Sequence, residues 1–206
     1  MDFDTLMSVI CQMQENIAEN REYLSDLDRA IGDGDHGINM DRGFREVMKK
    51  LEGSSINTPA DLLRTVGMTL AFKVGGAAGP LYGTAFMKAS EAVKGKETVS
   101  LDDLSPMLER AIEGIQLRGK AVRGEKTMLD ALIPAKEALD QALAKGFTGD
   151  DALDAMIKAA EDGAEYTKTI IATKGRASYV GERSIGHMDP GAASSCLLLN
   201  AIKTHT

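Results

Sequence analysis

The sequence has no tryptophan, few other aromatic residues and no cluster of basic residues. It contains five Phe and four Tyr among 206 residues, and 31 acidic residues outnumber 24 Lys and Arg, for a net charge of −7. A surface that binds nucleic acid needs positive charge, and usually aromatic rings on which bases stack. Because both are scarce, nucleic acid is not expected as a partner.

Cysteine and long apolar runs are also scarce. Cys11 and Cys196 are the two cysteines, and they form neither a disulfide framework, a zinc motif nor a CxxC redox motif. The N-terminal segment has no basic region and no apolar run long enough to insert into a membrane. We therefore expect a cytoplasmic protein without a signal peptide, a membrane anchor or a membrane partner.

Strand signals are almost absent, and nearly every segment between glycines repeats its apolar residues at the helical period. A chain of this length suits one domain, 1–206, which buries about 70% of the surface of the unfolded chain. The sequence therefore predicts a single-domain, all-α bundle of antiparallel helices. The helices are predicted near residues 4–19, 22–31, 39–51, 59–73, 80–93, 101–118, 126–144, 149–173 and 190–203.

The connections between these helices alternate between two kinds. The plain connections lie near residues 20–23, 52–58, 94–100 and 144–149. The others, which we call the site loops, are rich in glycine or charge and comprise residues 32–37, 74–80, 118–127 and 174–191. Successive short connections of an antiparallel bundle alternate between its two ends. All four site loops should therefore lie at one end and form one site.

The first site loop reads GDGDHG, at residues 32–37, and follows Asp28. The carboxylates of Asp28, Asp33 and Asp35 repel one another unless a cation neutralises them. Mg²⁺ is the expected cation, and three carboxylates suffice for two ions that share phosphate oxygens. A solvated acidic helix end is the alternative, but the three glycines predict a flexible loop that a plain surface does not require. An EF-hand is excluded, because position twelve counted from Asp33 is Phe44 rather than Glu.

Two further site loops offer groups that suit phosphate. The segment VGGAAGP, at 74–80, brings small residues to a helix N-terminus, where backbone N–H groups attract anions, although a tight helix–helix turn has the same composition. The segment RGKAVRGEKT, at 118–127, resembles a P-loop, but Glu125 separates Gly124 from Lys126 and no strand precedes it. We reject the P-loop. The basic side chains of residues 118–127 either supply positive charge to a phosphate site or are simply solvated.

Single residues of the loops have more than one possible role. In the long segment 174–191, Arg176 is the best candidate for a phosphate clamp, because a guanidinium binds oxyanions in a bidentate manner. Asp189 is expected at least to cap the following helix. His36 is a metal ligand, a phosphate donor, a phosphoryl acceptor or a residue that only bonds nearby. Met128 either forms an apolar contact surface for an adenine or packs in the core.

Taken together, these segments resemble the nucleotide-binding L subunit of bacterial dihydroxyacetone kinases over essentially the whole chain. The resemblance is carried by LDRAIGDGDHGINMDRGF, GMTLAFKVGGAAGPLYGT, RGKAVRGEKTMLDAL and KGRASYVGERSIGHMDPGA. It implies an antiparallel, barrel-like bundle of about eight helices, with Mg–ADP at one end.

The resemblance also implies a set of site residues. The metal ligands would be Asp28, Asp33 and Asp35, and Arg176 would serve catalysis by offsetting charge during phosphoryl transfer. The nucleotide contacts would be His36, Gly37, Ile38, Asn39, Ala77, Ala78, Gly119, Met128, Arg176, Asp189, Pro190 and Gly191. Members of the family commonly have Ser where this chain has Ala78, so a hydroxyl–phosphate hydrogen bond is absent at that position.

Two types of kinase are similar to this chain. This chain resembles the phosphotransferase-system type, because it has no fused dihydroxyacetone-binding domain and has His36 after the second Asp of the loop. That type holds ADP/ATP as a phosphoryl carrier between a phosphoryl-donor protein of the system and dihydroxyacetone on a separate subunit. The alternatives are an ATP-dependent kinase subunit with exchangeable nucleotide, a non-catalytic nucleotide-sensing adaptor, and the kinase domain of a fatty-acid kinase, which reads GDGDTG and is longer.

Overall fold

The structure, a computed structural model, describes residues 1–205, and helices form all the regular secondary structure of that part. This confirms the predicted all-α class. Thr206, the last residue of the expected domain 1–206, lies outside the described residues. The α-helices are α1 (Phe3–Glu19), α2 (Arg21–Ile31), α3 (His36–Leu51), α4 (Pro59–Lys73), α5 (Ala78–Ala92), α6 (Leu101–Gly119), α7 (Leu129–Ala144), α8 (Gly149–Tyr166) and α9 (Pro190–Lys203).

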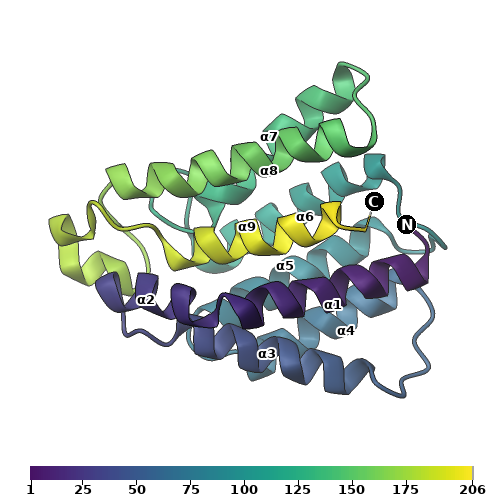
Figure 1. Ribbon diagram of the computed structural model, residues 1–206, viewed down its shortest axis with the longest axis horizontal. Coiled ribbons are helices and arrows are strands. Elements are labelled where there is room, and N and C mark those ends of the chain that lie inside the picture. The colour runs from purple at the N-terminus through teal and green to yellow at the C-terminus, as the bar shows by residue number, and fades with distance from the viewer. Residues whose placement is uncertain (206) are drawn as a thin grey trace.

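The helices lie roughly along the long axis of the molecule (Figure 1), and their contacts close a ring. From α2 to α9 each helix packs against the next, and α9 closes the ring by packing against α1. α1 and α2 lie nearly end to end and are separated by Asn20 alone, so the α-helices of residues 1–205 occupy about eight positions. This is the barrel-like arrangement that the family resemblance implies.

One predicted chain reversal, at residues 20–23, is wrong. Asn20 keeps a nearly helical backbone, with φ −98° and ψ 13°, so α2 continues in the direction of α1. Both helices pack against α9: Asn16 Nδ2 donates to the carbonyl of Leu197 (3.0 Å), and the Tyr23 hydroxyl lies 3.7 Å from Sδ of Met188, just before α9. The other chain reversals are as predicted, and the site loops still lie at one end.

Several helix boundaries in the site loops differ from prediction. α3 begins at His36 rather than near residue 39. α7 begins at Leu129 rather than at residue 126, because the Asp130 carboxylate accepts a hydrogen bond from the Thr127 backbone N–H (2.8 Å) and holds a turn there. Such side chain–backbone bonds compete locally with helix formation.

The segment before α9 differs from prediction in two ways. The predicted helix 149–173 ends at Tyr166 and is followed by a 3₁₀ turn, η1 (Thr167–Thr169). Within the fourth site loop, for which no helix was predicted, residues Arg176–Ser184 form a 3₁₀ segment, η2. Gly181 interrupts η2 with φ 58°, a conformation that favours glycine.

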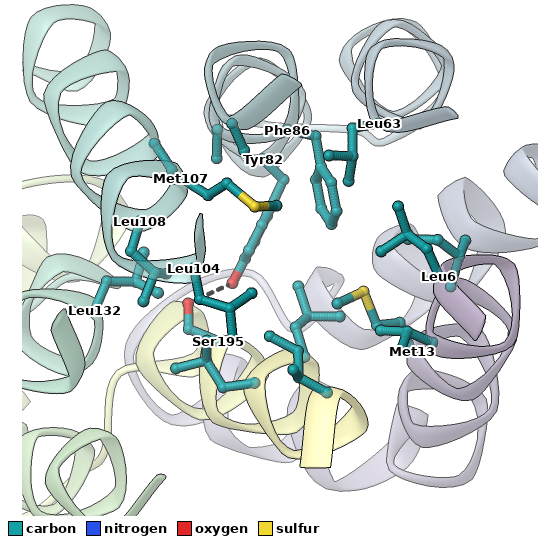
Figure 2. A pocket seen from close by; sticks show the side chains of 18 of the residues that line it. Leu6, Met13, Leu63, Tyr82, Phe86, Leu104, Met107, Leu108, Leu132 and Ser195 are labelled. Carbon is teal, nitrogen blue, oxygen red and sulfur yellow. Dashed lines mark hydrogen bonds between the residues drawn. The ribbon is translucent and has the colours of Figure 1, made fainter. Parts of the chain in front are cut away.

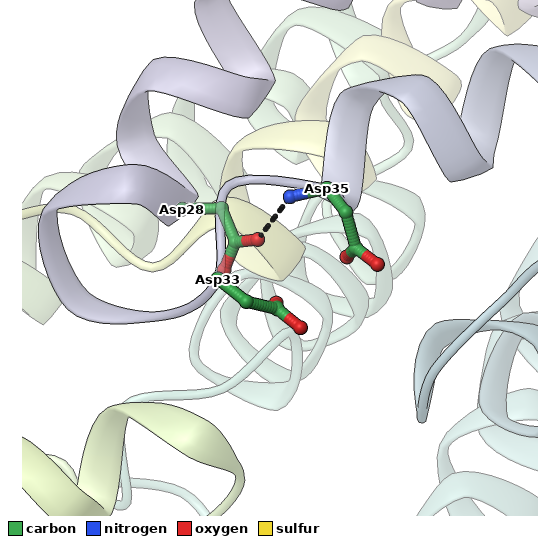
Figure 3. Close-up of side chains that lie close together, drawn as sticks. All are labelled: Asp28, Asp33 and Asp35. Atoms are coloured by element: carbon green, nitrogen blue, oxygen red, sulfur yellow. Dashed lines mark hydrogen bonds between the residues drawn. The ribbon is translucent and has the colours of Figure 1, made fainter.

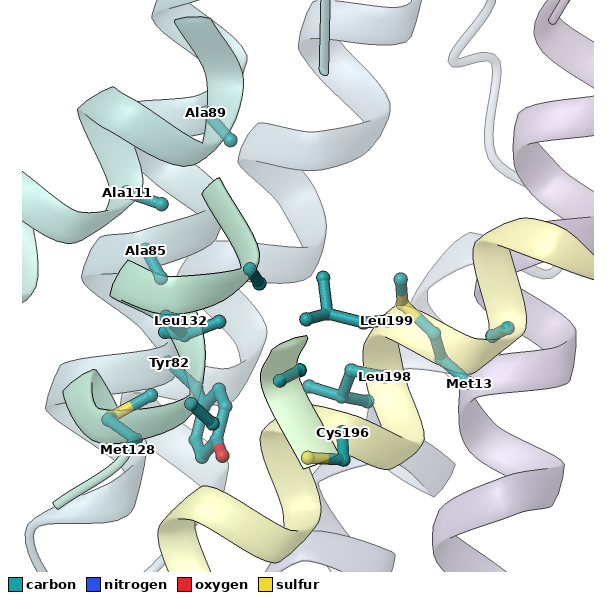
Figure 4. Close-up of a cluster of buried hydrophobic side chains, with 14 of the residues drawn as sticks. Met13, Tyr82, Ala85, Ala89, Ala111, Met128, Leu132, Cys196, Leu198 and Leu199 are labelled. Atoms are coloured by element: carbon teal, nitrogen blue, oxygen red, sulfur yellow. The ribbon is translucent and has the colours of Figure 1, made fainter. Parts of the chain in front are cut away.

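The interior of the ring is apolar. Figure 4 shows part of this core, in which Leu132, Leu198 and Leu199 meet Met13 and Tyr82. A cavity of about 120 Å³ remains, and its polar lining groups are the Tyr82 hydroxyl and Ser195, which are 3.0 Å apart (Figure 2). Among residues 1–205, no helix has the length and apolar character that crossing a membrane requires.

Candidate functional site

A pocket of about 490 Å³ opens at the end of the ring where α2 leads into α3, and residues from all four site loops line it. This volume lies in the usual range for small-molecule sites. The predicted gathering of the site loops is therefore observed. The predicted site residues that line the pocket are Asp28, Asp33, Asp35, His36, Asn39, Ala77, Ala78, Gly119, Met128, Arg176, Asp189, Pro190 and Gly191.

Two predicted nucleotide contacts, Gly37 and Ile38, do not line this pocket. Gly37 is buried, and a Cβ atom built on it would lie 1.9 Å from the carbonyl oxygen of Arg21. The Ile38 side chain is 50% exposed. Gly37 thus has a packing role, which is to let the first turn of α3 approach α2.

The three carboxylates form the acidic wall of the pocket (Figure 3). Asp28, Asp33 and Asp35 each offer an oxygen, and these oxygens all lie within 4.8 Å of one another. Asp28 Oδ2 accepts hydrogen bonds from the backbone N–H groups of Asp35 (2.9 Å) and His36 (3.2 Å), which hold the loop around the carboxylate. Burial raises the pKa of Asp28, the two hydrogen bonds lower it, and the charges of Asp33 and Asp35 raise it. An all-oxygen donor set whose charges repel one another fits a hard divalent cation.

Glycines shape this loop through close approach at one position and a left-handed backbone at another. A Cβ at Gly32 would lie 2.1 Å from Asp28 Oδ1, so a side chain there would displace the carboxylate. Gly34 has φ +77°, the left-handed region that other residues avoid. The backbone of the loop is therefore constrained around Asp28.

His36 contributes a neutral imidazole to the floor of the pocket. Its Nε2 lies 2.9 Å from Ser194 Oγ, which is 2.7 Å from the Tyr82 hydroxyl. Burial lowers the pKa of His36 to about 4, so the ring carries no charge near neutral pH. The hydrogen-bonded group joins the starts of α3 and α9 to α5. Nothing in the sequence distinguishes Tyr82 from any other aromatic residue in a helical repeat, so its place in this group was not predicted.

Arg176 begins η2, which packs against α2, and its side chain contacts the acidic wall. Its guanidinium Nη2 lies 2.9 Å from Asp33 Oδ2, and its side chain is 66% exposed. An exposed ion pair of this kind contributes little to stability. The guanidinium is thus available to an oxyanion that enters beside the carboxylates.

Lys126 occupies a position that the sequence did not indicate. It was expected to face phosphate or solvent, yet it is 1% exposed. Its ammonium donates to the backbone carbonyls of Thr167, Ile170 and His187. Lys120, on the same loop, is exposed, and no sequence signal separates the two lysines.

Asp189 caps α9, as predicted, and is buried beside the pocket. Its Oδ2 accepts a hydrogen bond from the backbone N–H of Ala192 (2.7 Å). Burial raises the pKa of Asp189 to about 7, against the effect of this hydrogen bond; Asp130 and Asp28 raise it, and Lys126 lowers it. Asp189 is therefore partly protonated near neutral pH.

The pKa of Asp189 predicts a pH-dependent stability. Because the pKa of about 7 in the folded protein lies above the ordinary value of 3.8, the folded protein holds the extra proton between these values. Stability must then fall as the pH rises through this window and level off above it. Relative to Asp189→Asn, which keeps a capping oxygen but has no proton to lose, the wild type should lose about 2 kcal/mol between about pH 5 and pH 8. Urea unfolding of both proteins in chelator measures this difference, and parallel pH profiles would contradict it.

Comparison with known proteins agrees with this geometry. A family model described as the DAK2 domain matches residues 30–204. The chain is 48% identical over 201 residues to the PEP-dependent dihydroxyacetone kinase 1, ADP-binding subunit DhaL, of Listeria innocua, covering 98% of this chain and 96% of that protein. It is 45% identical over 181 residues to the PEP-dependent dihydroxyacetone kinase, ADP-binding subunit DhaL, of Escherichia coli, covering 88% and 86%.

A solved structure shares the fold. The dihydroxyacetone kinase of C. freundii, in complex with AMP-PNP and Mg²⁺, superposes with a TM-score of 0.72 and 26% identity over 96% of this chain. This chain covers 33% of that chain, so it corresponds to about a third of the solved protein. The chain therefore belongs to the DAK2 domain family, in the group formed by the ADP-binding DhaL subunits of dihydroxyacetone kinases.

Proposed function

We propose that this chain is the ADP-binding subunit of a PEP-dependent dihydroxyacetone kinase of the phosphotransferase-system type. It holds ADP/ATP as a phosphoryl carrier between a donor protein and dihydroxyacetone on a separate subunit. The observation that carries the proposal is one pocket in which three clustered carboxylates face Arg176. The names of the nearly full-length relatives support the same function.

The carboxylates of Asp28, Asp33 and Asp35 would hold Mg²⁺, with two ions as the expected number. Their oxygens are close enough to share cations and are otherwise mutually repulsive. Bound Mg²⁺ neutralises phosphate oxygens and stabilises the charge that develops during phosphoryl transfer. The C. freundii structure with AMP-PNP and Mg²⁺ supports this assignment.

The nucleotide would lie between the acidic wall and the starts of α5 and α9. Ala77, the N-cap of α5, makes no side-chain cap hydrogen bond, so the first backbone N–H groups of that helix are open to phosphate. Ala78 has no side-chain hydroxyl, so only its backbone N–H would contact the phosphate. Met128 is buried yet lines the pocket, which gives the adenine an apolar surface.

Phosphoryl transfer in this site requires positioning and charge compensation rather than a nucleophile from this chain. Arg176 would bind the transferred group's oxygens and release Asp33 to the metal. The neutral imidazole of His36 keeps the floor of the pocket polar without adding charge. The acceptor hydroxyl and its base belong to the partner subunit, so the open end of the ring is also the docking face.

Retention of nucleotide tests the carrier function directly. The chain has no Trp and four Tyr, so copurified ADP would dominate its ultraviolet spectrum near 260 nm. ADP should remain bound through dialysis and accept phosphate in an assay reconstituted with the donor protein, the acceptor subunit and dihydroxyacetone. Rapid exchange would indicate the ATP-dependent type, and binding without transfer would indicate an adaptor. Absence of Mg²⁺-dependent ADP or ATP binding would refute the proposal.

Arg176→Met should lower the rate of phosphoryl transfer by about 100-fold, because the variant loses the guanidinium that compensates charge in the transition state. Nucleotide affinity should change less, since Mg²⁺ and the helix N-termini still hold the phosphates. Arg183→Met, an exposed position on the same 3₁₀ segment, is the matched control. Equal rates for the two variants would exclude Arg176 from catalysis.

A further inference from the structure

Lys126 forms hydrogen bonds with both ends of one segment. We call residues 167–188, which connect α8 to the N-cap of α9, the strap. The ammonium of Lys126 donates to the carbonyls of Thr167 and His187, at opposite ends of the strap, and to that of Ile170 at 3.4 Å. An ammonium has three donors. Lys126 also lines the pocket, but all three of its donors are directed to backbone carbonyls rather than to the space a phosphate would occupy.

The position of Lys126 carries an energetic cost. Its backbone has φ 61°, a left-handed conformation that costs a residue with a side chain about 1 kcal/mol. Burial of its charge lowers the pKa of Lys126, and the carboxylates of Asp189 and Asp130 raise it. A buried charge is tolerated only when such partners compensate for lost solvation. The contacts with the strap are therefore what stabilises this conformation.

The loop around Lys126 is itself held in place. The carboxylate of Asp130 accepts hydrogen bonds from the backbone N–H groups of Gly124 and Thr127. Glu125 adds two contacts to the strap: its carbonyl accepts from the Thr173 N–H (3.3 Å) and its Oε1 from the Thr173 hydroxyl (3.1 Å). Lys126 thus projects from a fixed turn into the strap.

The strap has few apolar contacts of its own. Of its buried apolar residues, Ala172 and Ala177 form a small cluster with Ile31 that is separate from the main core, and only Met188, at its end, joins the main core. Yet the strap carries Arg176 to within 2.9 Å of Asp33 and leads into the cap of α9 at Asp189. With so little apolar burial, polar contacts must determine where the strap lies.

We infer that Lys126 is a positioning residue that holds the strap, and through it Arg176 and the start of α9, against the nucleotide pocket. The inference rests on the proposed function and adds to it a residue that touches neither metal nor phosphate. Loss of the ammonium should release the strap while leaving the ring of helices intact. Bound ADP should then escape faster, because the residues that enclose it on this side are no longer held.

The test compares Lys126→Met with Lys120→Met. Both lysines lie on the same loop in left-handed conformations, φ 61° and φ 52°, but only the first is buried. Amide hydrogen exchange should accelerate by about tenfold or more in the strap of Lys126→Met and remain unchanged in α4 and α5. ADP release, followed by displacement with excess ATP, should also be about tenfold faster, whereas Lys120→Met should match the wild type.

Adenosine separates positioning from direct phosphate binding. If Lys126 acts through the strap, Lys126→Met should lose affinity for adenosine as well as for ADP, since the strap leads into the α9 start beside the nucleotide. Loss of ADP affinity alone would show a direct phosphate contact and overturn the inference. Unchanged exchange in the strap would overturn it equally.

Lys126→Arg covers the case in which Lys126→Met does not fold. It keeps the charge, but a planar guanidinium cannot direct its donors to the same three carbonyls. Faster strap exchange with an unchanged ring would support the inference, and wild-type exchange together with wild-type ADP release would overturn it.

Failure of the unaltered protein to bind ADP would refute the proposed function instead. The hydrogen-exchange measurement distinguishes this failure from failure of the inference, because it needs no nucleotide.

Discussion

Replacing Asp35 by Asn should weaken Mg²⁺-dependent binding of ADP by about 100-fold, or about 2.7 kcal/mol. The substitution removes one of three carboxylates whose oxygens lie within 4.8 Å of one another, and with it a charged ligand of the expected cation. The Asp35 side chain makes no cap hydrogen bond to α3, so Asn leaves local structure intact. Titration calorimetry with ADP, in Mg²⁺ and in chelator, measures the effect.

Without metal, the same substitution should not destabilise the protein. In chelator, Asp35→Asn removes a charge that repels Asp28 and Asp33, so the variant should be at least as stable as the wild type. Asp26→Asn is the matched control, because Asp26 is exposed on α2 and pairs with Arg29 away from the cluster. An Asp35→Asn protein with undiminished Mg²⁺-dependent affinity would disprove the metal assignment.

Gly37→Ala should produce a large loss of stability, about 3 kcal/mol in the free energy of unfolding. The added Cβ would lie 1.9 Å from the Arg21 carbonyl oxygen and 2.8 Å from Ser25 Oγ, so α2 and α3 would have to separate. Movement of the first turn of α3 would also displace His36 and reduce ADP affinity. Urea unfolding measures the stability change.

Gly53→Ala distinguishes steric overlap from backbone strain. Gly53 has φ +68° but no atom within 4 Å of a built Cβ, so its substitution should cost about 1 kcal/mol through conformation alone. Equal losses at Gly37 and Gly53 would mean that the close approach of α2 and α3 does not limit stability.

Much of the fold could be predicted because its signals are local. Helical periodicity located the helices, and Asp189 before Pro190 correctly indicated the start of α9. The reversal predicted at residues 20–23 failed because the direction of the chain there depends on a single backbone conformation, that of Asn20. The bundle end that carries the site was nevertheless identified, since the remaining connections alternate as expected.

The candidate site was predicted in composition but only partly in arrangement. The carboxylates lie within eight residues of one another in the chain, so their proximity follows from the sequence. Lys126 and Tyr82 could not be recognised, because their partners, His187 and Ser194, are far away in the sequence. Gly37 was assigned to the nucleotide; the structure shows in addition a packing role that the sequence did not indicate.

The sequence by itself determined the all-α class, the positions of most helices, and the chemical types that meet at one end of the ring. These follow from periodicity, capping and loop composition, which act over a few residues. Only the tertiary structure decided which basic side chains stay exposed at the pocket and which are buried against backbone carbonyls. Arg176 reaches Asp33, while Lys126, an equally basic loop residue, turns inward to backbone carbonyls. The physical reason is that burial and long-range hydrogen bonds depend on how the strap packs against the ring.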